Sequence, residues 1–181
     1  MTVRAIVCTT MDGKLDAPLS WRHGGWTSCE DKDRFWSMVS WCDVAIFGRL
    51  TWRDFIRIDL HLKVSALCEP WVMSRDHNLA KLDRIEVTHD TLQTFRLLMG
   101  RLPDYADRKI LVCGGASTYA FCRTWIDEWY ITVEPVMSGH GQSFMPDDGE
   151  EPFMEAFKLY NVKTTPTGIL FMDYRRAKKG G

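Results

Sequence analysis

The sequence predicts a single α/β domain with three layers, in which helices cover a mostly parallel central sheet that ends in an antiparallel C-terminal hairpin. Short apolar runs of strand length, as at 43–47 and 109–113, alternate with segments of helical spacing. These runs lack polar alternation, which is typical of parallel strands covered on both faces. Residues 158–165 and 169–175 read as two strands joined through the turn at 166–168, which predicts the hairpin.

Composition is typical of a soluble globular protein. The 181 residues are 45% hydrophobic and 26% charged, with a formal net charge of −1, so the chain is long enough to bury a sizeable core. The balanced charge gives no reason to expect a nucleic acid or an anionic membrane as partner. No apolar run reaches membrane-spanning length. We expect one domain over 1–175, followed by a basic tail over 176–181.

The cysteines and histidines show no metal-site pattern. The six cysteines contain no C-x-x-C pair, which argues against zinc-ribbon and thioredoxin-like proteins. Several lie inside apolar runs, where a reduced thiol behaves as a small hydrophobe. The five histidines lack metal-ligand spacing, and we expect no metal. The first residues are too few and too strand-like for a signal peptide, so a cytoplasmic enzyme or binding domain is expected.

The first part of the chain reads as strand, loop and helix. Residues 3–9 form the first expected strand, and the tryptophan-containing loop at 16–27 either covers a flat ligand or packs on the domain. Thr27-Ser-Cys-Glu30 fits a capping box that opens a helix. The buried face of this helix is marked by apolar residues at i, i+3, i+4 and i+7: Phe35, Met38, Val39 and Cys42.

The βα alternation continues after the second strand, at 43–47. Residues 52–55 read as helical, whereas 56–69 give no clear pattern. The remaining expected elements are, in order, strands at 71–73 and 85–87, a helix at 92–102 ended by Pro103, a strand at 109–113, a helix after Gly114 and Gly115, a strand at 129–136, an apolar patch at 153–157, and the hairpin.

Three strand ends carry residues suited to a nucleotide with several phosphates. The first strand end offers a backbone that a phosphate can approach closely, together with a guanidinium and a hydroxyl group. The second strand end offers a hydroxyl and a guanidinium group. The third is a glycine pair that opens a helix, where free N–H groups favour anions. In chain order these sets are Gly48, Arg49 and Thr51; Ser74 and Arg75; and Gly114, Gly115, Ala116 and Ser117. Because ligands of open α/β sheets bind at the carboxyl ends of the strands, we expect the three sets to share one crevice.

Several motifs resemble the dihydrofolate-reductase-like superfamily, in particular the stand-alone relatives of the riboflavin-biosynthesis reductase domain. They occur in the order of that family and cover nearly the whole chain. They are Thr10-Met-Asp12-Gly13-Lys14, Ser28-Cys-Glu30-Asp31, Phe47-Gly48-Arg49-Leu-Thr51-Trp52, Val112-Cys-Gly114-Gly115-Ala, and the run from Ile126-Asp127-Glu128 through Pro135 and Gly139 to Gly141.

The resemblance implies an NADPH-dependent oxidoreductase that acts on a small-molecule substrate as a homodimer. According to this resemblance, the cofactor phosphates are held from one side by Gly48, Arg49 and Thr51. Ser74 and Arg75 take the adenosine 2′-phosphate, which favours NADPH over NADH. The pyrophosphate is held from the other side by the residues of the glycine turn: Gly114, Gly115, Ala116 and Ser117.

The resemblance also implies a substrate side near the first strand. Asp31 matches the helix carboxylate that contacts the pteridine ring in dihydrofolate reductases, and Lys14 matches a substrate-side lysine of riboflavin reductases. Asp12, Trp26 and Glu30 are expected beside them. Simpler interpretations stay open, because acidic residues also cap helices and Lys14 also suits a solvated turn.

Departures from the family pattern keep three functions in view. Cys113 stands where riboflavin reductases usually carry an acidic residue, and the segment at 51–55 reads more like dihydrofolate reductase. The first function is reduction of a C=N bond in a pyrimidine- or pteridine-like substrate, as in riboflavin biosynthesis. The second is dihydrofolate reduction. The third, of another class, is a nucleotide-binding module without turnover.

Overall fold

The computed structural model describes residues 1–17, 25–73, 87–88, 107–145 and 153–177. Its strands are β1 (Thr2–Thr10), β2 (Val44–Gly48), β3 (Glu69–Met73), β4 (Val87–Thr88), β5 (Lys109–Val112), β6 (Glu128–Glu134), β7 (Phe157–Thr164) and β8 (Leu170–Arg176). Its helices are α1 (Cys29–Trp41), α2 (Arg49–Arg57), α3 (Leu60–Leu67), α5 (Ala116–Cys122) and α6 (Phe153–Ala156).

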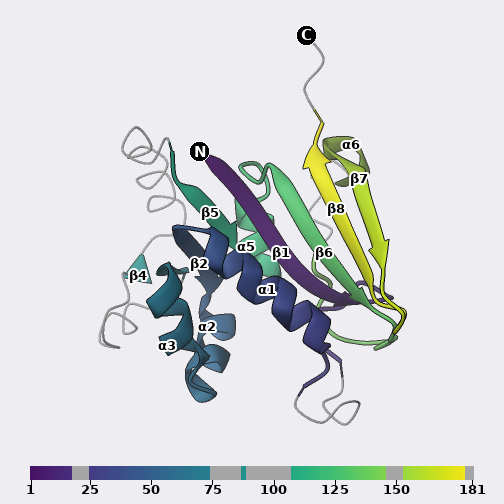
Figure 1. The fold of residues 1–181 in the computed structure, drawn as a ribbon, viewed down its shortest axis with the longest axis horizontal. Coiled ribbons are helices and arrows are strands. Elements are labelled where there is room, and N and C mark those ends of the chain that lie inside the picture. Colours follow the sequence, from purple (N-terminus) through teal and green to yellow (C-terminus); the bar gives the residue numbers. More distant parts are fainter. Residues whose placement is uncertain (18–24, 74–86, 89–106, 146–152, 178–181) are drawn as a thin grey trace.

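The described strands form one eight-stranded sheet in the order β4-β3-β2-β5-β1-β6-β8-β7. The six strands from β4 to β6 run parallel, whereas β8 pairs antiparallel with both β6 and β7. The strand β1 lies near the middle, between β5 and β6 (Figure 1). The predicted mostly parallel sheet with a C-terminal antiparallel hairpin is confirmed.

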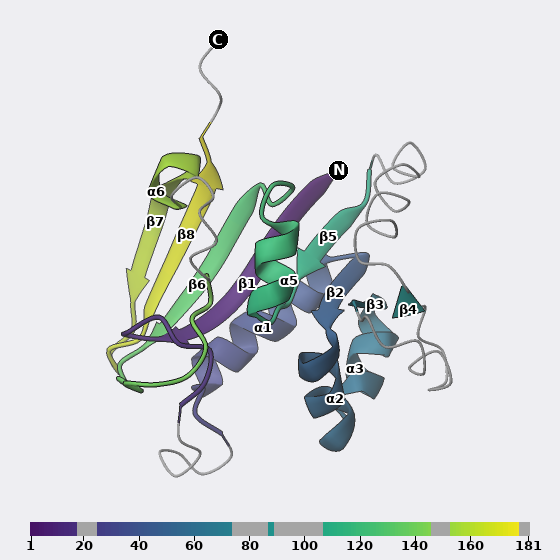
Figure 2. The same cartoon turned by 180° about the vertical axis from the view of Figure 1, so that it is seen from behind.

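Helices lie on both faces of this sheet, which gives the three predicted layers. The helix α1 crosses one face (Figure 1), and α5 covers the other (Figure 2). Alternate residues of β2 serve the two cores, because successive side chains of a strand point to opposite faces. Val44 and Ile46 pack in the core that contains Tyr119 of α5, whereas Ala45 and Phe47 pack in the core beneath α1, α2 and α3.

The helix α1 begins one residue later than the capping box predicts. Ser28, not Thr27, is the N-cap, and its hydroxyl accepts a hydrogen bond of 3.1 Å from the N–H of Asp31. The partner three residues after the cap is therefore Asp31 rather than Glu30. The predicted buried face is confirmed at Met38, Val39 and Cys42. The shift turns Asp31 toward the sheet.

The segment at 56–69, which had no assigned structure, contains the end of α2 and the whole of α3. Asp59 lies between the two helices in the left-handed conformation. In α3 only Val64 is buried, while Leu62 and Leu67 are exposed. An apolar pattern spread over both buried and exposed positions hides the helical period.

The C-terminal hairpin is present, with a register shift between Leu159 and Asn161 of β7. The apolar patch at 153–157 becomes the short helix α6 and the first residue of β7. Arg176, expected in the tail, belongs to β8, and its Nε donates a 2.9 Å hydrogen bond to the carbonyl of Ile126. The predicted strand at 85–87 overlaps β4 only at Val87, and the predicted helix at 92–102 lies outside the described residues.

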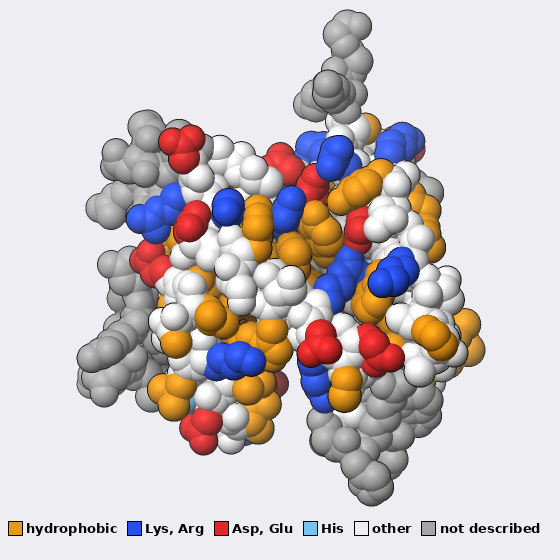
Figure 3. All heavy atoms as spheres, viewed as in Figure 1, with side chains coloured by type: hydrophobic (Ala, Val, Ile, Leu, Met, Phe, Trp, Pro, Cys, Tyr) orange, Lys and Arg blue, Asp and Glu red, His pale blue; other side chains and the backbone are white. Residues whose placement is uncertain are grey.

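The six cysteines are all free thiols, and three of them (Cys42, Cys113 and Cys122) are buried. Among the described residues, no helix combines the length and the apolar character that a membrane span requires. On the face that carries α1, the surface is hollowed between the lobe of α2 and α3 and the start of α1 (Figure 3).

Candidate active site

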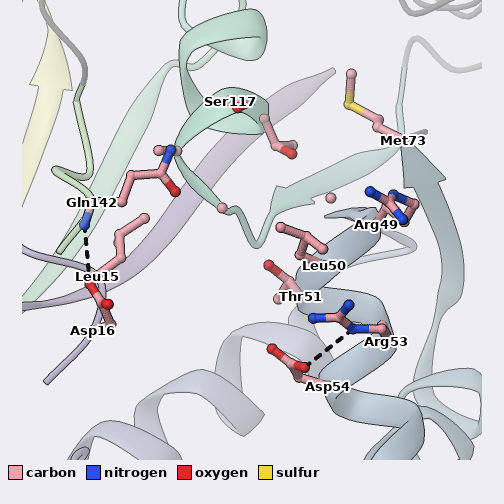
Figure 4. A pocket seen from close by; sticks show the side chains of 14 residues that line it. Leu15, Asp16, Arg49, Leu50, Thr51, Arg53, Asp54, Met73, Ser117 and Gln142 are labelled. Carbon is pink, nitrogen blue, oxygen red and sulfur yellow. Dashed lines mark hydrogen bonds and ion pairs between the residues drawn. The ribbon is translucent and has the colours of Figure 1, made fainter. Parts of the chain in front are cut away.

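A cavity of about 710 Å³ lies at the carboxyl ends of β2 and β3. One wall is formed by the start of α2 and Met73, and the opposite wall by segments near Leu15 and Gln142 (Figure 4). The lining residues are Leu15, Asp16, Gly48, Arg49, Leu50, Thr51, Arg53, Asp54, Met73, Gly115, Ala116, Ser117, Thr118 and Gln142. Its size falls within the range of about 300–1,000 Å³ that is typical of ligand sites.

Gly48 joins β2 to α2 at the floor of this cavity. It is the N-cap of α2 and supplies no side chain to cap the helix, so the first-turn N–H groups and the positive end of the helix dipole face the cavity region. Arg49 and Thr51 follow in the first turn and also line the cavity. The predicted set Gly48, Arg49 and Thr51 therefore lies together.

The glycine pair after β5 meets Gly48 directly. The N–H of Gly48 donates a hydrogen bond of 2.5 Å to the carbonyl of Gly114. Gly114 has φ +89°, and a Cβ atom there would lie 2.6 Å from the Tyr119 ring, so only glycine suits this position. The peptide bond between Gly114 and Gly115 is cis.

The remaining members of the predicted pyrophosphate set continue around the cavity. Gly115 is the N-cap of α5, without a side-chain cap, and Ala116 and Ser117 begin the helix. All three line the cavity, whereas Gly114 is not among the lining residues. The hydroxyl of Tyr119, one turn into α5, donates a 2.6 Å hydrogen bond to the carbonyl of Ile6. This bond fixes α5 against the central strand.

The opposite wall is built from two segments more than 120 residues apart in sequence. The carboxylate of Asp16 accepts a 3.2 Å hydrogen bond from the N–H of Gln142 (Figure 4). Nearby, Nζ of Lys14 lies 3.0 Å from the hydroxyl of Ser143. Neither segment belongs to a predicted helix or strand, and nothing in the sequence pairs them. Sequence reasoning therefore missed Leu15, Asp16 and Gln142.

Arg53 and Asp54 were also missed, although helical spacing points to Arg53. It lies four residues after Arg49 on α2, and residues four apart share a helix face. The Nε of Arg53 lies 3.8 Å from the Asp54 carboxylate. The cavity thus combines two guanidinium groups, the hydroxyls of Thr51 and Ser117, and backbone exposed at glycine.

A second group of polar residues lies where α1 begins. Asp31 is buried, with 7% of its surface exposed. Burial raises the pKa of its carboxyl group, and the charge of Glu134 raises it further, while Thr132, Cys8 and Arg34 act in the opposite direction. The pKa of Asp31 is therefore higher than that of an ordinary aspartate. A carboxyl group of this kind can retain a proton and donate it.

Glu134 at the end of β6 is fully buried beside this group. Its Oε1 accepts a 2.6 Å hydrogen bond from the N–H of Ser28. Sequence reasoning missed Glu134 as a site residue. A signal was present, since a single carboxylate interrupts the apolar strand predicted at 129–136, and buried charges require partners.

The other predicted substrate-side residues have structural contacts. Asp12 accepts hydrogen bonds from the hydroxyl of Thr10 and from the N–H groups of Ser138 and Gly139. These bonds hold the pKa of Asp12 well below its usual range. Glu30 accepts a 3.1 Å hydrogen bond from the hydroxyl of Thr167.

The side chain of Lys14 forms a hydrogen bond with Ser143 rather than with Asp31. Trp26 lies in the segment that leads to α1, and its side chain is half-buried. Ser74 and Arg75 lie outside the described residues, directly after Met73 of the cavity wall. The catalytic and binding roles of all these residues stay predictions.

Strand order, layers and the two glycine turns define the dihydrofolate-reductase-like fold, and solved structures confirm it. A pyrimidine reductase-like protein from Corynebacterium diphtheriae matches with a TM-score of 0.72 and 16% identity, over 98% of this chain and 92% of its own. Dihydrofolate reductase from Enterococcus faecalis, solved with NADP(H), matches with a TM-score of 0.67 and 15% identity, over 98% and 97%.

A bifunctional protein shares the same fold. The diaminohydroxyphosphoribosylaminopyrimidine deaminase/5-amino-6-(5-phosphoribosylamino)uracil reductase from Thermotoga maritima matches with a TM-score of 0.69 and 15% identity. The match covers 97% of this chain and 56% of that protein. No family model matches the sequence, and no curated protein matches it significantly. At sequence identities of 15–16%, the similarity to these structures shows that the chain shares their fold.

Proposed function

We propose that the chain is an NADPH-dependent reductase that transfers a hydride to a C=N bond of a pyrimidine- or pteridine-like substrate, as in riboflavin biosynthesis. One observation carries the proposal. The βα turns at Gly48 and Gly115, predicted separately from sequence, line one cavity together with Arg49, Thr51 and Ser117. Neighbours with this fold include reductases, and one of them was solved with NADP(H).

The donor set of the cavity fits a dinucleotide with several phosphates. Guanidinium groups and hydroxyls bind phosphate oxygens through charge-assisted hydrogen bonds. The uncapped start of α2 adds N–H donors. Arg49 and Thr51 would contact phosphates from the α2 side, and Ser117 from the α5 side. Ser74 and Arg75 follow Met73 of the cavity wall, so they are the proposed contacts for the 2′-phosphate.

When bound, NADPH supplies the hydride, and the residues of the chain orient it and provide the proton. Asp31 is the proposed acid, because its raised pKa keeps a proton available at higher pH than an ordinary aspartate does. The buried surroundings of Asp31 exclude bulk water from that proton. The interpretation of Asp31 as a mere cap does not account for its carboxyl group, since the cap bond uses its backbone N–H.

The first test concerns the cofactor. Arg49→Ala removes a guanidinium from the cavity and should weaken NADPH binding by roughly tenfold or more, since a hydrogen bond to a charged group is worth about 1.5–3 kcal/mol. Arg57→Ala is the matched control, because Arg57 lies two turns later on the same helix and is outside the lining. Isothermal titration with NADPH measures both. Equal affinities in the two variants would contradict the assignment of the cavity.

Dihydrofolate reduction is the second candidate, favoured by the buried carboxyl group of Asp31 at the start of α1. NADPH oxidation followed at 340 nm with dihydrofolate, or with 5-amino-6-(5-phosphoribosylamino)uracil, separates the two reductases. Binding of NADPH without oxidation by either substrate would instead favour the nucleotide-binding module. No binding at all would reject the proposed function.

A further inference from the structure

Two carboxyl groups are buried together where α1 begins above the end of β6. Asp31 has 7% of its surface exposed and Glu134 has none. Ser28 contacts both residues, because its hydroxyl accepts the N–H of Asp31 and its own N–H donates to Oε1 of Glu134 at 2.6 Å. The N-cap of α1 therefore joins the two acids, and like charges held this close disfavour each other.

Sheet register places the two acids on the same face. Glu134 follows Thr132 by two residues on β6, so their side chains point to the same side, about 7 Å apart along the strand. Thr132 and Glu134 pair with Cys8 and Thr10 of β1. Asp31 interacts electrostatically with Cys8, Thr132 and Glu134. It thus lies over β1 and β6, on the face that α1 covers (Figure 1).

Among the described residues, Arg34 is a cation that acts on Asp31, and other groups already engage its guanidinium. Arg34 lies one helical turn after Asp31 and favours the charged form of that carboxyl group. Its guanidinium forms an ion pair with Asp173 of β8 and donates a 3.2 Å hydrogen bond to the carbonyl of Ile131. The charge of Arg34 is therefore largely compensated by Asp173.

We propose that Asp31 and Glu134 form a carboxyl pair that holds one proton and delivers it to the substrate nitrogen during reduction of a C=N bond. Asp31 is the donor, and Glu134 is a positioning residue that acts through Asp31. The role in turnover rests on the proposed function, whereas the sharing of a proton does not. Two buried acids that share a site cannot both be charged at low cost.

The proposed step balances in atoms and electrons. The carbon of the C=N bond gains the hydride, with its two electrons, from the bound dinucleotide, which leaves oxidised. The π electron pair moves to nitrogen, and nitrogen takes the proton from Asp31. Solvent then returns one proton to the pair. Glu134 keeps Asp31 protonated because its charge disfavours a second charge nearby.

The direct test is a pH titration of the Asp31 carboxyl carbon by ¹³C NMR in the unliganded protein. Glu134→Gln should move the Asp31 midpoint to lower pH by about one unit or more, since it removes the like charge. Asp33→Asn is the control, because Asp33 is an exposed acid two residues away on α1. It should leave the midpoint within about 0.3 units, because a charge exposed to water is screened. An unchanged midpoint in Glu134→Gln would overturn the proposal.

Asp31→Asn provides the reciprocal measurement where Glu134→Gln does not fold. Asparagine has nearly the shape of a neutral aspartic acid, so the pair loses one titrating group with little change in packing. The free energy of unfolding in urea should then depend less on pH than in the wild type, because the buried group whose charge is disfavoured is gone. A pH dependence of stability that stays the same as in the wild type would reject the pair.

Turnover adds a readout that a merely structural Glu134 would not move. In the wild type, NADPH oxidation should fall as pH rises through the midpoint of the pair. In Glu134→Gln this fall should occur at lower pH than in the wild type. A loss of rate that is equal at every pH would overturn the role in turnover. A wild type without NADPH oxidation rejects the proposed function, and the NMR comparison still decides the pair.

Discussion

Gly48 lies where the two βα turns of the cavity meet. Its φ of −74° is open to any residue, so its need for glycine is steric. A Cβ atom there would lie 2.6 Å from the hydroxyl of Thr118 and 3.2 Å from the carbonyl of Gly114. The sequence pattern predicts glycine for close approach of a phosphate, and the structure shows that the close neighbour is the chain itself. Gly48 therefore has to leave room both for a phosphate, as the sequence pattern predicts, and for Thr118 and Gly114.

Gly48→Ala should therefore destabilise the protein by about 1–3 kcal/mol, the usual range for a side chain forced into a packed site. Urea unfolding followed by tryptophan fluorescence measures the change. Adding Thr118→Ala removes the nearer obstacle, so the double variant should regain part of the loss. If the double variant is as unstable as the sum of the single ones, the steric explanation is wrong.

Residue types alone identified the glycine turns because glycine directly after an apolar strand is itself the sequence signal of such a turn. They did not identify Glu134, Asp16 or Gln142, whose roles depend on which distant segment lies opposite. The N-cap of α1 was misplaced by one residue because Thr27 and Ser28 are both good caps. Only packing decides which acid, Glu30 or Asp31, turns toward the sheet.

At the scale of elements, Glu128 ties three strands together. It begins β6, and its carboxylate lies 2.9 Å from Nε of Arg4 on β1 and 2.8 Å from the guanidinium of Arg175 on β8. The hydroxyl of Tyr130 donates a further bond of 2.9 Å. Burial alone would raise the pKa of Glu128, but the bonds from Tyr130 and Arg175 and the charge of Arg4 outweigh it and lower the pKa.

Glu128→Gln should cost about 1.5–3 kcal/mol of stability at pH 7, as is usual for hydrogen bonds to a charged group. A lowered pKa in the folded state means that this stabilisation is present above the ordinary value of 4.5 and is lost as pH falls below it. The difference between the variant and the wild type should therefore shrink in urea titrations below about pH 4.

Glu69→Gln is the control for this prediction. Glu69 forms an ion pair of 3.1 Å with Arg108 in which the side chains are 49% and 40% exposed, far more than that of Glu128. Exposed pairs contribute about 0–1 kcal/mol, so this variant should change stability less than Glu128→Gln does. A larger effect at Glu69 would contradict the view that burial sets the strength of these pairs.

Elements were predictable from sequence where one face of the chain is buried and the other is not. The stripe of α1 follows this rule, whereas β2 was recognisable as a continuous apolar run because both of its faces are buried. The helix α3 does not, because Leu62 and Leu67 are exposed while only Val64 is buried. Its position is set by packing against α1 and α2, which local periodicity does not record.

For the whole molecule, the sheet is more protected at β1, near its centre, than at the edge formed by β7. Alternation of strands and helices was enough to predict three layers and a mostly parallel sheet. The strand order was not predictable from alternation, because β1 pairs with strands that follow it by more than a hundred residues. The homodimer implied by the family resemblance stays a prediction that analytical ultracentrifugation would test.

Amide hydrogen exchange should follow this gradient. The interior of β1 lies between β5 and β6 and is largely buried, whereas seven of the eight residues of β7 are exposed. We expect the amides of β7 that bond to β8 to exchange at least about tenfold faster than those in the middle of β1. Mass spectrometry of peptic fragments measures this, and equal rates would indicate that the sheet opens only as one unit.

The position of β1 also affects how the chain folds as it is made. Val3, Ile6 and Val7 of this first strand find no neighbour in the sheet until residues from Lys109 onward have been synthesised. Until then a ribosome-bound chain exposes an apolar strand without sheet partners. Chaperones bind segments of this kind, and such segments aggregate when no chaperone covers them. Fusion of the first 105 residues to a folding reporter should therefore give insoluble product, whereas fusion after Arg176 should not.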